Sequence, residues 1–404
     1  MRSPAAAAAS RSPVRSASAV AAPAARALRA SASSPSARRA SMSVRTAAAA
    51  PPLASLPGPT STIDFDHIGF GLEHVGSRMF LATWREGADG KGSWDEGELR
   101  PYGPLEMMPS AQVLNYGQAL FEGLKAQRTA DGRVVLFRPD ANAGRMQDGA
   151  RRMHMAEPPL ELFERGVVEA VRANAELVPP HGKGALYIRP LLLGSGPILG
   201  VAPSKEYTFL VFVAAVGAYF KGGQLSPIEL RVETNIHRAA PRGTGATKAA
   251  GNYSPGLVTL ADAKKNGFAD VVYLDAKHDT YLEEVSSCNV FVLTKDNVIK
   301  TPPLAGSILP GVTRRSIIQL AKDLGYEVRE EPVSVQEALE AKEMFTSGTA
   351  VVVASVNALT YKGERKVFGT DGEYGEVAKK LYHQLVGVQT GELEDIHGWV
   401  RVIG

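Results

Sequence analysis

The amino-acid composition changes abruptly near residue 63, and this change decides which part of the chain can fold. Residues 1–62 contain eight arginines, no lysine and no acidic residue, and the first carboxylate is Asp64. Of the first 50 residues, 20 are Ala and 11 are Ser. Arg-rich, Ser-rich and acid-free segments are typical of organelle transit peptides. We therefore expect residues 1–60 to be a disordered targeting segment and the fold to be built from the rest.

The composition of this segment also indicates its destination. A secretory signal needs a continuous apolar core of about 7–15 residues, whereas arginines separate the Ala runs here. The length and the Ser and Ala content favour a plastid, with a mitochondrion as the alternative. The plainer alternative is a disordered basic tail without any address.

Charge, hydropathy and cysteine content exclude several classes of protein. The eight N-terminal arginines exceed the net charge of +3, so the body is acidic and offers no electrostatic basis for binding nucleic acid. The longest uncharged apolar run, Tyr207 to Phe220, is shorter than the about 20 residues of a membrane span. Cys288 is the single cysteine, which excludes an intrachain disulfide framework. The eight histidines lack metal-ligand spacing.

The body reads as short strands alternating with helices, which indicates an α/β or α+β fold in two lobes. A Gly/Pro break at Lys221–Pro227 is the best domain boundary. We expect a small N-terminal domain at 63–220, a linker at 221–229 and a larger C-terminal domain at 230–404. The clearest expected elements are helices at 140–155, 159–177, 254–267 and 313–324, and strands at 185–193, 207–220, 270–275, 289–294 and 350–354.

The most unusual stretch is Arg242–Gly256, in which Lys248 lies among Gly and Ala residues. A lysine with few neutralising neighbours can have a lowered pKa and act as an amine nucleophile. A phosphate-binding loop does not fit, because Thr247 precedes the lysine and Ala249 follows it. A surface turn with a solvated lysine is the plainer alternative.

Two further loops are candidates for anion binding. Pro303–Gly311 leads into the helix expected at Thr313, and free N–H groups before a helix attract phosphate. Ser347–Ala350 offers the N–H groups of small residues and a hydroxyl. Gly194–Gly200 faintly resembles a dinucleotide-binding loop, but its spacing is wrong and Pro197 has no N–H, so we interpret it as a turn.

Together these stretches resemble the branched-chain amino acid aminotransferases, which are pyridoxal-phosphate enzymes of the type IV, D-amino-acid-aminotransferase-like fold. The resemblance is an ordered series of motifs and covers residues from about 65 to 400. The motifs are Leu114–Ala126, Leu136–Pro139 followed by Arg145, Tyr187–Pro190, Val216–Tyr219, Lys248–Tyr253, Leu282–Asn289, Thr301–Gly311 and Ser347–Ala350.

The resemblance implies which residues bind pyridoxal 5′-phosphate. Lys248 is expected to form the Schiff base and then to act as general base and acid at the substrate Cα. Glu284 matches the carboxylate that pairs with the pyridine nitrogen, with its neighbour Glu283 as the alternative. Tyr253 matches the tyrosine that binds the 3′ oxygen. The expected phosphate-side residues are Arg145, the backbone N–H groups of Ser307 and Ile308, and the hydroxyl of Thr349; Ser287 stands where the family often has Thr.

The plainer alternative for Arg145 is a solvated helical arginine like Arg151 and Arg152. On the substrate side, the resemblance implies that the N–H groups of Thr349 and Ala350 bind the substrate carboxylate. The expected pocket residues are Tyr116, Tyr187, Arg189 and Tyr219, and less directly Phe70. Tyr187 and Arg189 are two apart on an expected strand, which puts them on one face. A C-x-x-C pair found in some members is absent, because Val351–Ala354 follows the turn.

The implied activity is reversible transfer of an amino group between L-leucine, L-isoleucine or L-valine and 2-oxoglutarate. The implied partners are small amino acids and 2-oxo acids and a second copy of the chain, without nucleic acid or membrane. The alternatives are a D-amino-acid aminotransferase, an aminodeoxychorismate lyase, an aminotransferase for methionine-derived 2-oxo acids, and a non-catalytic binding protein with this fold.

Residues 1–60 fused to a fluorescent reporter should direct the reporter to plastids, because the acid-free Arg/Ser/Ala composition is what import machineries recognise. Imaging of cells that contain plastids checks this. Fluorescence in the cytosol would contradict the transit-peptide interpretation, and fluorescence in mitochondria would correct only the destination.

Overall fold

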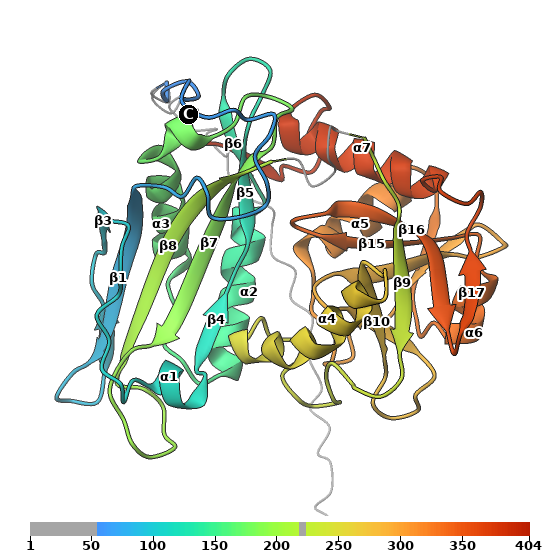
Figure 1. Cartoon of the computed structure of the whole chain (residues 1–404). Helices are drawn as coiled ribbons and strands as arrows, with labels where there is room; N and C mark the ends of the chain where they lie inside the picture. Colours follow the sequence, from blue (N-terminus) through green and yellow to red (C-terminus); the bar gives the residue numbers. More distant parts are fainter. Residues whose placement is uncertain (1–54, 218–223) are drawn as a thin grey trace, which may run out of the picture. The chain divides into compact units, whose positions relative to one another are not determined.

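The computed structural model describes residues 55–217 and 224–404, and these form part of one unit, Pro52–Gly404. Within it are two nine-stranded sheets, each with helices packed against it (Figure 1). We call the part around the first sheet the first lobe and the part around the second sheet the second lobe. The expected targeting segment up to residue 54 and the predicted pocket residue Tyr219 lie outside the described residues.

The first sheet is antiparallel, in the order β18-β6-β5-β7-β8-β1-β2, with β3 paired to β1 and β4 paired to β7. Its strands are β1 (Arg78–Glu86), β2 (Gly92–Trp94), β3 (Glu98–Pro101), β4 (Ala119–Phe121), β5 (Leu124–Arg128), β6 (Val134–Phe137), β7 (Ala185–Gly194), β8 (Glu206–Val216) and β18 (Val400–Val402). Its helices are α1 (Gln112–Tyr116), α2 (Pro139–Arg152) and α3 (Leu160–Arg172).

Alternation along β7 separates the core from the face that holds polar side chains. Leu186, Ile188 and Leu192 are buried in a core that α3 covers, where Phe163 and Val167 pack. Tyr187 and Arg189 are less buried and lie on the opposite face of the strand. The expected strand at 185–193 is thus confirmed, and its register places these two polar residues together.

The second sheet is mixed, in the order β11-β10-β9-β16-β15-β12-β13-β14, with β17 paired to β16. Its strands are β9 (Ile228–Glu233), β10 (Asp270–Leu274), β11 (Leu282–Val285), β12 (Asn289–Leu293), β13 (Val298–Thr301), β14 (Glu327–Glu330), β15 (Glu343–Gly348), β16 (Val352–Tyr361) and β17 (Glu364–Val367). Its helices are α4 (Leu257–Lys265), α5 (Val312–Asp323), α6 (Val335–Glu340) and α7 (Glu376–Thr390).

The end of the chain returns to the first lobe, which differs from the expected boundary at residue 230. Strand β18 pairs antiparallel with β6, with Arg401 opposite Leu136. The Gly404 carbonyl also accepts a hydrogen bond from the Val134 N–H at 2.6 Å. Sequence reading assigned all of 230–404 to the second domain because three residues of strand give too weak a pattern to show their partner.

The strand expected at 350–354 begins two residues late. β15 and β16 pair antiparallel up to Gly348 opposite Val352, and residues 349–351 form the turn between them. Val352 has φ of 61°, a left-handed conformation that is strained for a β-branched residue. Such strain persists only where surrounding contacts hold the backbone in place.

Asn174 joins the end of α3 to β1, so its loss should destabilise the first lobe. The fully buried amide accepts from the Arg78 N–H at 3.1 Å and donates to the carbonyls of Arg78 and Ala170 at 3.0 and 2.7 Å. Asn174→Ala should lower the free energy of unfolding by about 3 kcal/mol, because it leaves buried polar groups unpaired. Denaturant titration measures this, with the exposed Asn266→Ala as a control expected to cost under about 1 kcal/mol. Equal effects would contradict the assignment.

Candidate active site

The candidate site is a pocket to which both lobes contribute. Arg145 reaches it from α2 of the first lobe, and the other lining residues belong to the second lobe. Those residues are Arg238, Lys248, Tyr253, Glu284, Ser286, Ser287, Asn289, Leu309, Gly311, Val312, Thr313, Ser347, Gly348 and Thr349. The structure therefore brings together most of the residues that sequence analysis expected to bind a cofactor.

Lys248 is held in the pocket by its backbone and by two aromatic rings. Its carbonyl accepts a hydrogen bond from the Phe121 N–H at 3.2 Å, and Ala249 forms a bridge with Leu120 of β4. Its Nζ donates to the Tyr253 Oη at 3.2 Å and lies 4.4 Å from the centre of the Phe121 ring. The Gly/Ala-rich loop is thus fixed to the first lobe, and its amine points into the pocket.

Glu284 and Glu283 alternate on β11, and only Glu284 lines the pocket. The Glu284 carboxylate accepts from the Asn289 side chain at 3.1 Å and from the Leu309 N–H at 3.0 Å, and it forms an ion pair with Arg238. These three donors fix its position as well as its charge.

Glu283 accepts a hydrogen bond from the Ser307 hydroxyl instead, and its other oxygen, Oε2, has no hydrogen-bond partner among the described residues. Burial raises the pKa of Glu283 above its ordinary value. The geometry agrees with the choice of Glu284 over its neighbour.

Arg145 is buried and paired, which excludes the alternative of a solvated helical arginine. It is 8% exposed and forms a two-point ion pair with Glu122, with nitrogen–oxygen distances of 2.8 and 2.7 Å. Its third contact is the Pro310 carbonyl at 3.1 Å. Burial is the largest single influence and acts to lower the pKa of Arg145, but the charge and hydrogen bond of Glu122, together with Tyr253 and Tyr187, raise that pKa above its ordinary value. The pocket therefore holds a permanent cation in a fixed orientation.

The N-terminus of α5 presents backbone N–H groups at the pocket. It follows the loop that contains Ser307 and Ile308, whose N–H groups sequence analysis predicted to bind phosphate. Gly311, Val312 and Thr313 line the pocket, whereas Ser307 and Ile308 are buried and do not. No side chain caps the first N–H groups of α5 in the part of the chain that the structure describes. Free N–H groups at a helix start attract anions, so Val312 and Thr313 are further anion-binding candidates, and the roles of Ser307 and Ile308 stay predictions.

Thr349 and Ser287 lie at the pocket as expected, and Ala350 lies just beside it. The Thr349 hydroxyl donates to the Gly123 carbonyl at 3.2 Å, which again links the two lobes. The Ala350 carbonyl accepts from the Lys125 ammonium at 2.9 Å and faces a neighbouring cavity. The Ser347 hydroxyl is buried at the pocket and has no hydrogen-bond partner among the described residues, so it is free to contact a bound molecule.

Three of the expected substrate-side residues form one cluster. The Tyr187 hydroxyl accepts from Arg189 at 3.2 Å, and the Phe70 ring meets the Tyr187 ring edge-on at 5.3 Å. The Arg189 guanidinium lies 5.1 Å from the centre of the Phe121 ring, the same ring that contacts Lys248. Apolar rings and a cation therefore lie next to the reactive amine.

The expected pocket residue Tyr116 does not belong to this cluster. Its hydroxyl donates to the Leu199 carbonyl at 2.6 Å, and the residue is 46% exposed on the first lobe. No contact joins it to the Tyr187 cluster in the described residues.

Sequence analysis missed Glu122, Arg238, Asn289 and Phe121. Glu122 and Phe121 lie within the motif Leu114–Ala126, so their position in that motif was the available signal. Asn289 closes the motif that begins at Leu282. Arg238 lies outside every motif, and nothing in its local sequence distinguishes it from other arginines.

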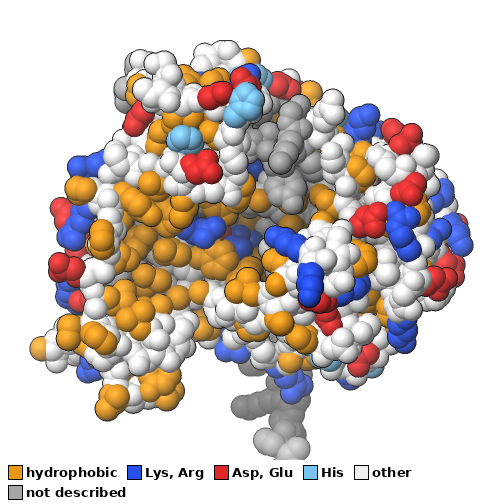
Figure 2. Space-filling view, viewed as in Figure 1, with side chains coloured by type: hydrophobic (Ala, Val, Ile, Leu, Met, Phe, Trp, Pro, Cys, Tyr) orange, Lys and Arg blue, Asp and Glu red, His pale blue; other side chains and the backbone are white. Residues whose placement is uncertain are grey.

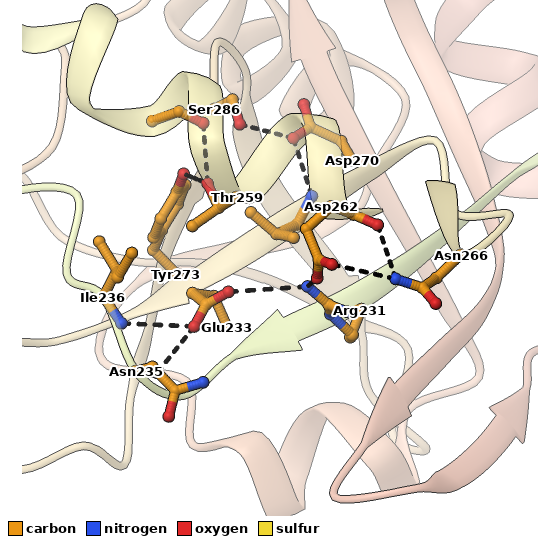
Figure 3. A network of polar contacts seen from close by, with 12 residues as sticks. Arg231, Glu233, Asn235, Ile236, Thr259, Asp262, Asn266, Asp270, Tyr273 and Ser286 are labelled. Carbon is orange, nitrogen blue, oxygen red and sulfur yellow. Dashed lines mark hydrogen bonds and ion pairs between the residues drawn. The ribbon is translucent and has the colours of Figure 1, made fainter. Parts of the chain in front are cut away.

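A polar network behind the pocket supports its wall (Figure 3). The hydroxyl of Ser286, which lines the pocket, donates to Asp270 at 2.6 Å. Asp270 also accepts from the Val271 N–H at 2.8 Å. Burial raises the pKa of Asp270. The network ties the loop after Glu284 to β10 and, through Tyr273 and Thr259, ties β10 to α4.

Comparison with known proteins places this site in a class. The family described as amino-transferase class IV matches residues 119–359. The branched-chain-amino-acid aminotransferase 5, chloroplastic, of Arabidopsis thaliana is 51% identical over 337 residues, which are 83% of this chain and 79% of that protein. The chain belongs to the branched-chain-amino-acid aminotransferases of this class.

Solved structures agree with this assignment. The Escherichia coli branched-chain amino acid aminotransferase has a TM-score of 0.68 at 30% identity, covering 80% of this chain and 99% of that one. The T.th. branched-chain amino acid aminotransferase with pyridoxamine 5′-phosphate has a TM-score of 0.68 at 26% identity, covering 83% and 100%. The expected type IV fold is thereby confirmed.

Neither a membrane span nor a metal cluster is found in the described residues. Residues 55–217 and 224–404 contain no helix long and apolar enough to cross a membrane. The same residues contain no group of three or more His, Cys, Asp or Glu side chains that could hold a metal ion.

Glu284→Gln should slow turnover by about 10²-fold or more, because it removes the negative charge that faces the pocket. Glu283→Gln is the matched control and should change turnover by less than about threefold, since Glu283 does not line the pocket. Steady-state kinetics with L-leucine measures both. If Glu283→Gln lost turnover and Glu284→Gln kept it, Glu283 and not Glu284 would be the functional carboxylate.

Proposed function

We propose that this chain is a pyridoxal-phosphate-dependent aminotransferase that reversibly transfers the amino group of L-leucine, L-isoleucine or L-valine to 2-oxoglutarate. The observation on which this rests is the convergence of Lys248, Tyr253, Glu284 and Arg145 on one pocket. Membership of the branched-chain-amino-acid aminotransferases supports the substrate class.

The residues of the pocket fit the cofactor. Arg145 and the first N–H groups of α5, at Val312 and Thr313, would bind its phosphate. Glu284 would face its ring nitrogen and Tyr253 its 3′ oxygen. When bound, pyridoxal phosphate acts as an electron sink that makes the proton on the substrate Cα removable.

Lys248 provides the amine that moves protons. Its Nζ is the lysine amine that lines the pocket, and its contacts with Tyr253 and Phe121 limit where it can reach. It therefore takes the proton from the substrate Cα and returns a proton when the amino group has moved. Lys248 would serve the reverse transfer in the same way, with the order of its two proton transfers exchanged.

Glu284 keeps a negative charge at a fixed point of the pocket. Arg238, Asn289 and the Leu309 N–H hold both of its oxygens. A carboxylate held in this way would keep a proton on the ring nitrogen of the cofactor, which is the condition under which that ring accepts electrons.

The aromatic cluster suits two kinds of substrate side chain. The rings of Phe70, Tyr187 and Phe121 offer apolar contact for a branched aliphatic group. Arg189 offers a cation for the second carboxylate of glutamate or 2-oxoglutarate. The N–H groups of Thr349 and Ala350 would bind the carboxylate that both kinds of substrate share.

We further propose that two copies of the chain form a homodimer. Figure 2 shows hydrophobic side chains spread over the face of the first lobe. Exposed apolar areas of this extent mark interaction surfaces. Exposed large apolar residues of the first lobe are Phe70, Leu72, Tyr102, Leu105, Met108, Leu114, Tyr116, Leu160, Leu199 and Val201. Phe70 and Tyr116, two of the expected pocket residues, are among them, so a second copy would complete the pocket.

The place of action is a plastid. The acid-free composition of residues 1–60 and the name of the chloroplastic Arabidopsis relative support it.

Lys248→Ala should abolish transamination of L-leucine while still binding pyridoxal phosphate, since Arg145, Tyr253 and Glu284 do not depend on the lysine. In the wild type, borohydride should fix the cofactor covalently to one peptide containing Thr247–Ala249. Peptide mass spectrometry and a coupled assay measure this, with the exposed Lys264→Ala as the matched control. Reduced cofactor on another lysine, or near-normal turnover of Lys248→Ala, would contradict the assignment.

A panel of L- and D-amino acids and 2-oxo acids tests the substrate class on the protein lacking residues 1–60. We expect turnover of the three L-branched substrates with 2-oxoglutarate. A preference for D-amino acids, or for a methionine-derived 2-oxo acid, would move the chain to one of the alternatives.

A further inference from the structure

Lys125 joins the two lobes at a point that the proposed mechanism does not use. It lies on β5 of the first lobe, and its Nζ donates to the Ala350 carbonyl of the second lobe at 2.9 Å. Ala350 belongs to the turn between β15 and β16, whose N–H groups we assigned to the substrate carboxylate. This hydrogen bond is therefore one residue away from the substrate-binding groups.

The Lys125 ammonium has no carboxylate within ion-pair distance among residues 55–217 and 224–404. Tyr187 lies opposite it on β7, and Arg128 and Tyr382 line the same cavity. Its neutral polar neighbours include Gln127 and Gln389. Burial without a negative partner lowers the pKa of Lys125 to about 8. Burying an ammonium group without a carboxylate partner costs free energy. The hydrogen bond to the Ala350 carbonyl offsets part of that cost.

The backbone directly after the turn that Lys125 contacts is held under strain. Val352, two residues beyond Ala350, has φ of 61°. The Thr349 hydroxyl and Lys125 both anchor the turn to the first lobe, through the Gly123 carbonyl and the Ala350 carbonyl respectively. Strained backbone relaxes when the contacts that hold it are removed. The position of the Thr349 and Ala350 N–H groups thus depends on these two hydrogen bonds.

We propose that Lys125 is a positioning residue for substrate binding: by holding the Ala350 carbonyl it aims the N–H groups of the turn at the substrate carboxylate. The proposal rests on the proposed function, because it needs a carboxylate substrate at this turn. It differs from the role of Lys248 in that Lys125 acts only through the backbone of the turn.

The proposal has a pH dependence of defined sign. Below pH about 8 Lys125 is charged and its hydrogen bond to the carbonyl is charge-assisted. As the pH rises through that value the ammonium loses its proton, the bond weakens, and the turn is held less firmly. Carboxylate binding should therefore weaken as the pH rises from 7 to 9.

The test measures binding of 4-methylpentanoic acid, which is leucine without its amino group, to the cofactor-loaded enzyme by calorimetry. Lys125→Met should weaken binding at pH 7 by about tenfold, the effect of one charge-assisted hydrogen bond. It should raise the KM for L-leucine and for 2-oxoglutarate by a similar factor and change kcat less. Lys366→Met, which removes an exposed lysine on β17, should bind the acid like the wild type.

Lys125→Arg separates positioning from folding. Arginine keeps its charge throughout this pH range, so it should restore binding at pH 7 and remove the decline between pH 7 and 9. The pH profiles of the wild type and of Lys125→Arg are compared. Titration of groups that the substitution leaves unchanged contributes equally to both profiles. Equal affinity of Lys125→Met and the wild type at pH 7, or an unchanged decline in Lys125→Arg, would overturn the proposal. A wild-type enzyme that neither binds the acid nor transaminates leucine would overturn the proposed function itself, and the role of Lys125 with it.

Discussion

The backbone hydrogen bond from the Phe121 N–H to the Lys248 carbonyl fixes where the reactive amine can be. Lys248 lies in a loop of the second lobe that lacks regular structure before η3 (Ala250–Asn252), and such loops have many accessible conformations. Pairing with β4, through this bond and the bridge between Leu120 and Ala249, gives the loop a strand-like partner. The Phe121 ring also contacts the Lys248 amine. The backbone of Phe121 therefore holds the backbone of Lys248, and the side chain of Phe121 contacts the end of the Lys248 side chain.

Around this point the site is built from buried charges that are paired before any substrate arrives. Arg145 with Glu122, and Arg238 with Glu284, are ion pairs in which all four residues are almost entirely buried. Burying charges is costly, and further hydrogen bonds to the carboxylates offset part of that cost, although the buried Arg238 Nε has no hydrogen-bond partner among the described residues. Asn142 donates to Glu122 at 2.7 Å, and Asn289 donates to Glu284. Groups oriented in this way need little rearrangement when a charged molecule binds.

The sequence was sufficient to predict features that depend on local pattern. The helix expected at 313–324 is observed at Val312–Asp323, and the strand expected at 270–275 is observed at Asp270–Leu274, because periodicity and Gly stops act within a few residues. Features that depend on distant partners were not predictable. The predicted residues Ser307 and Ile308 do not line the pocket, whereas Val312 and Thr313, a few residues later in the chain, do. Arg238 likewise belongs to the site only because it forms an ion pair with Glu284, which lies 46 residues later in the sequence.

The pairing of β18 with β6 has a consequence for the order in which the molecule forms. The edge of the first sheet is completed by residues 400–402, which follow the whole second lobe in the sequence. During synthesis domains generally fold from the N-terminal end as units, yet here the first lobe remains an unfinished sheet until the residues beyond the second lobe are made. The first sheet therefore cannot be completed before the residues of the second lobe have been made, so the two lobes reach their final structure together.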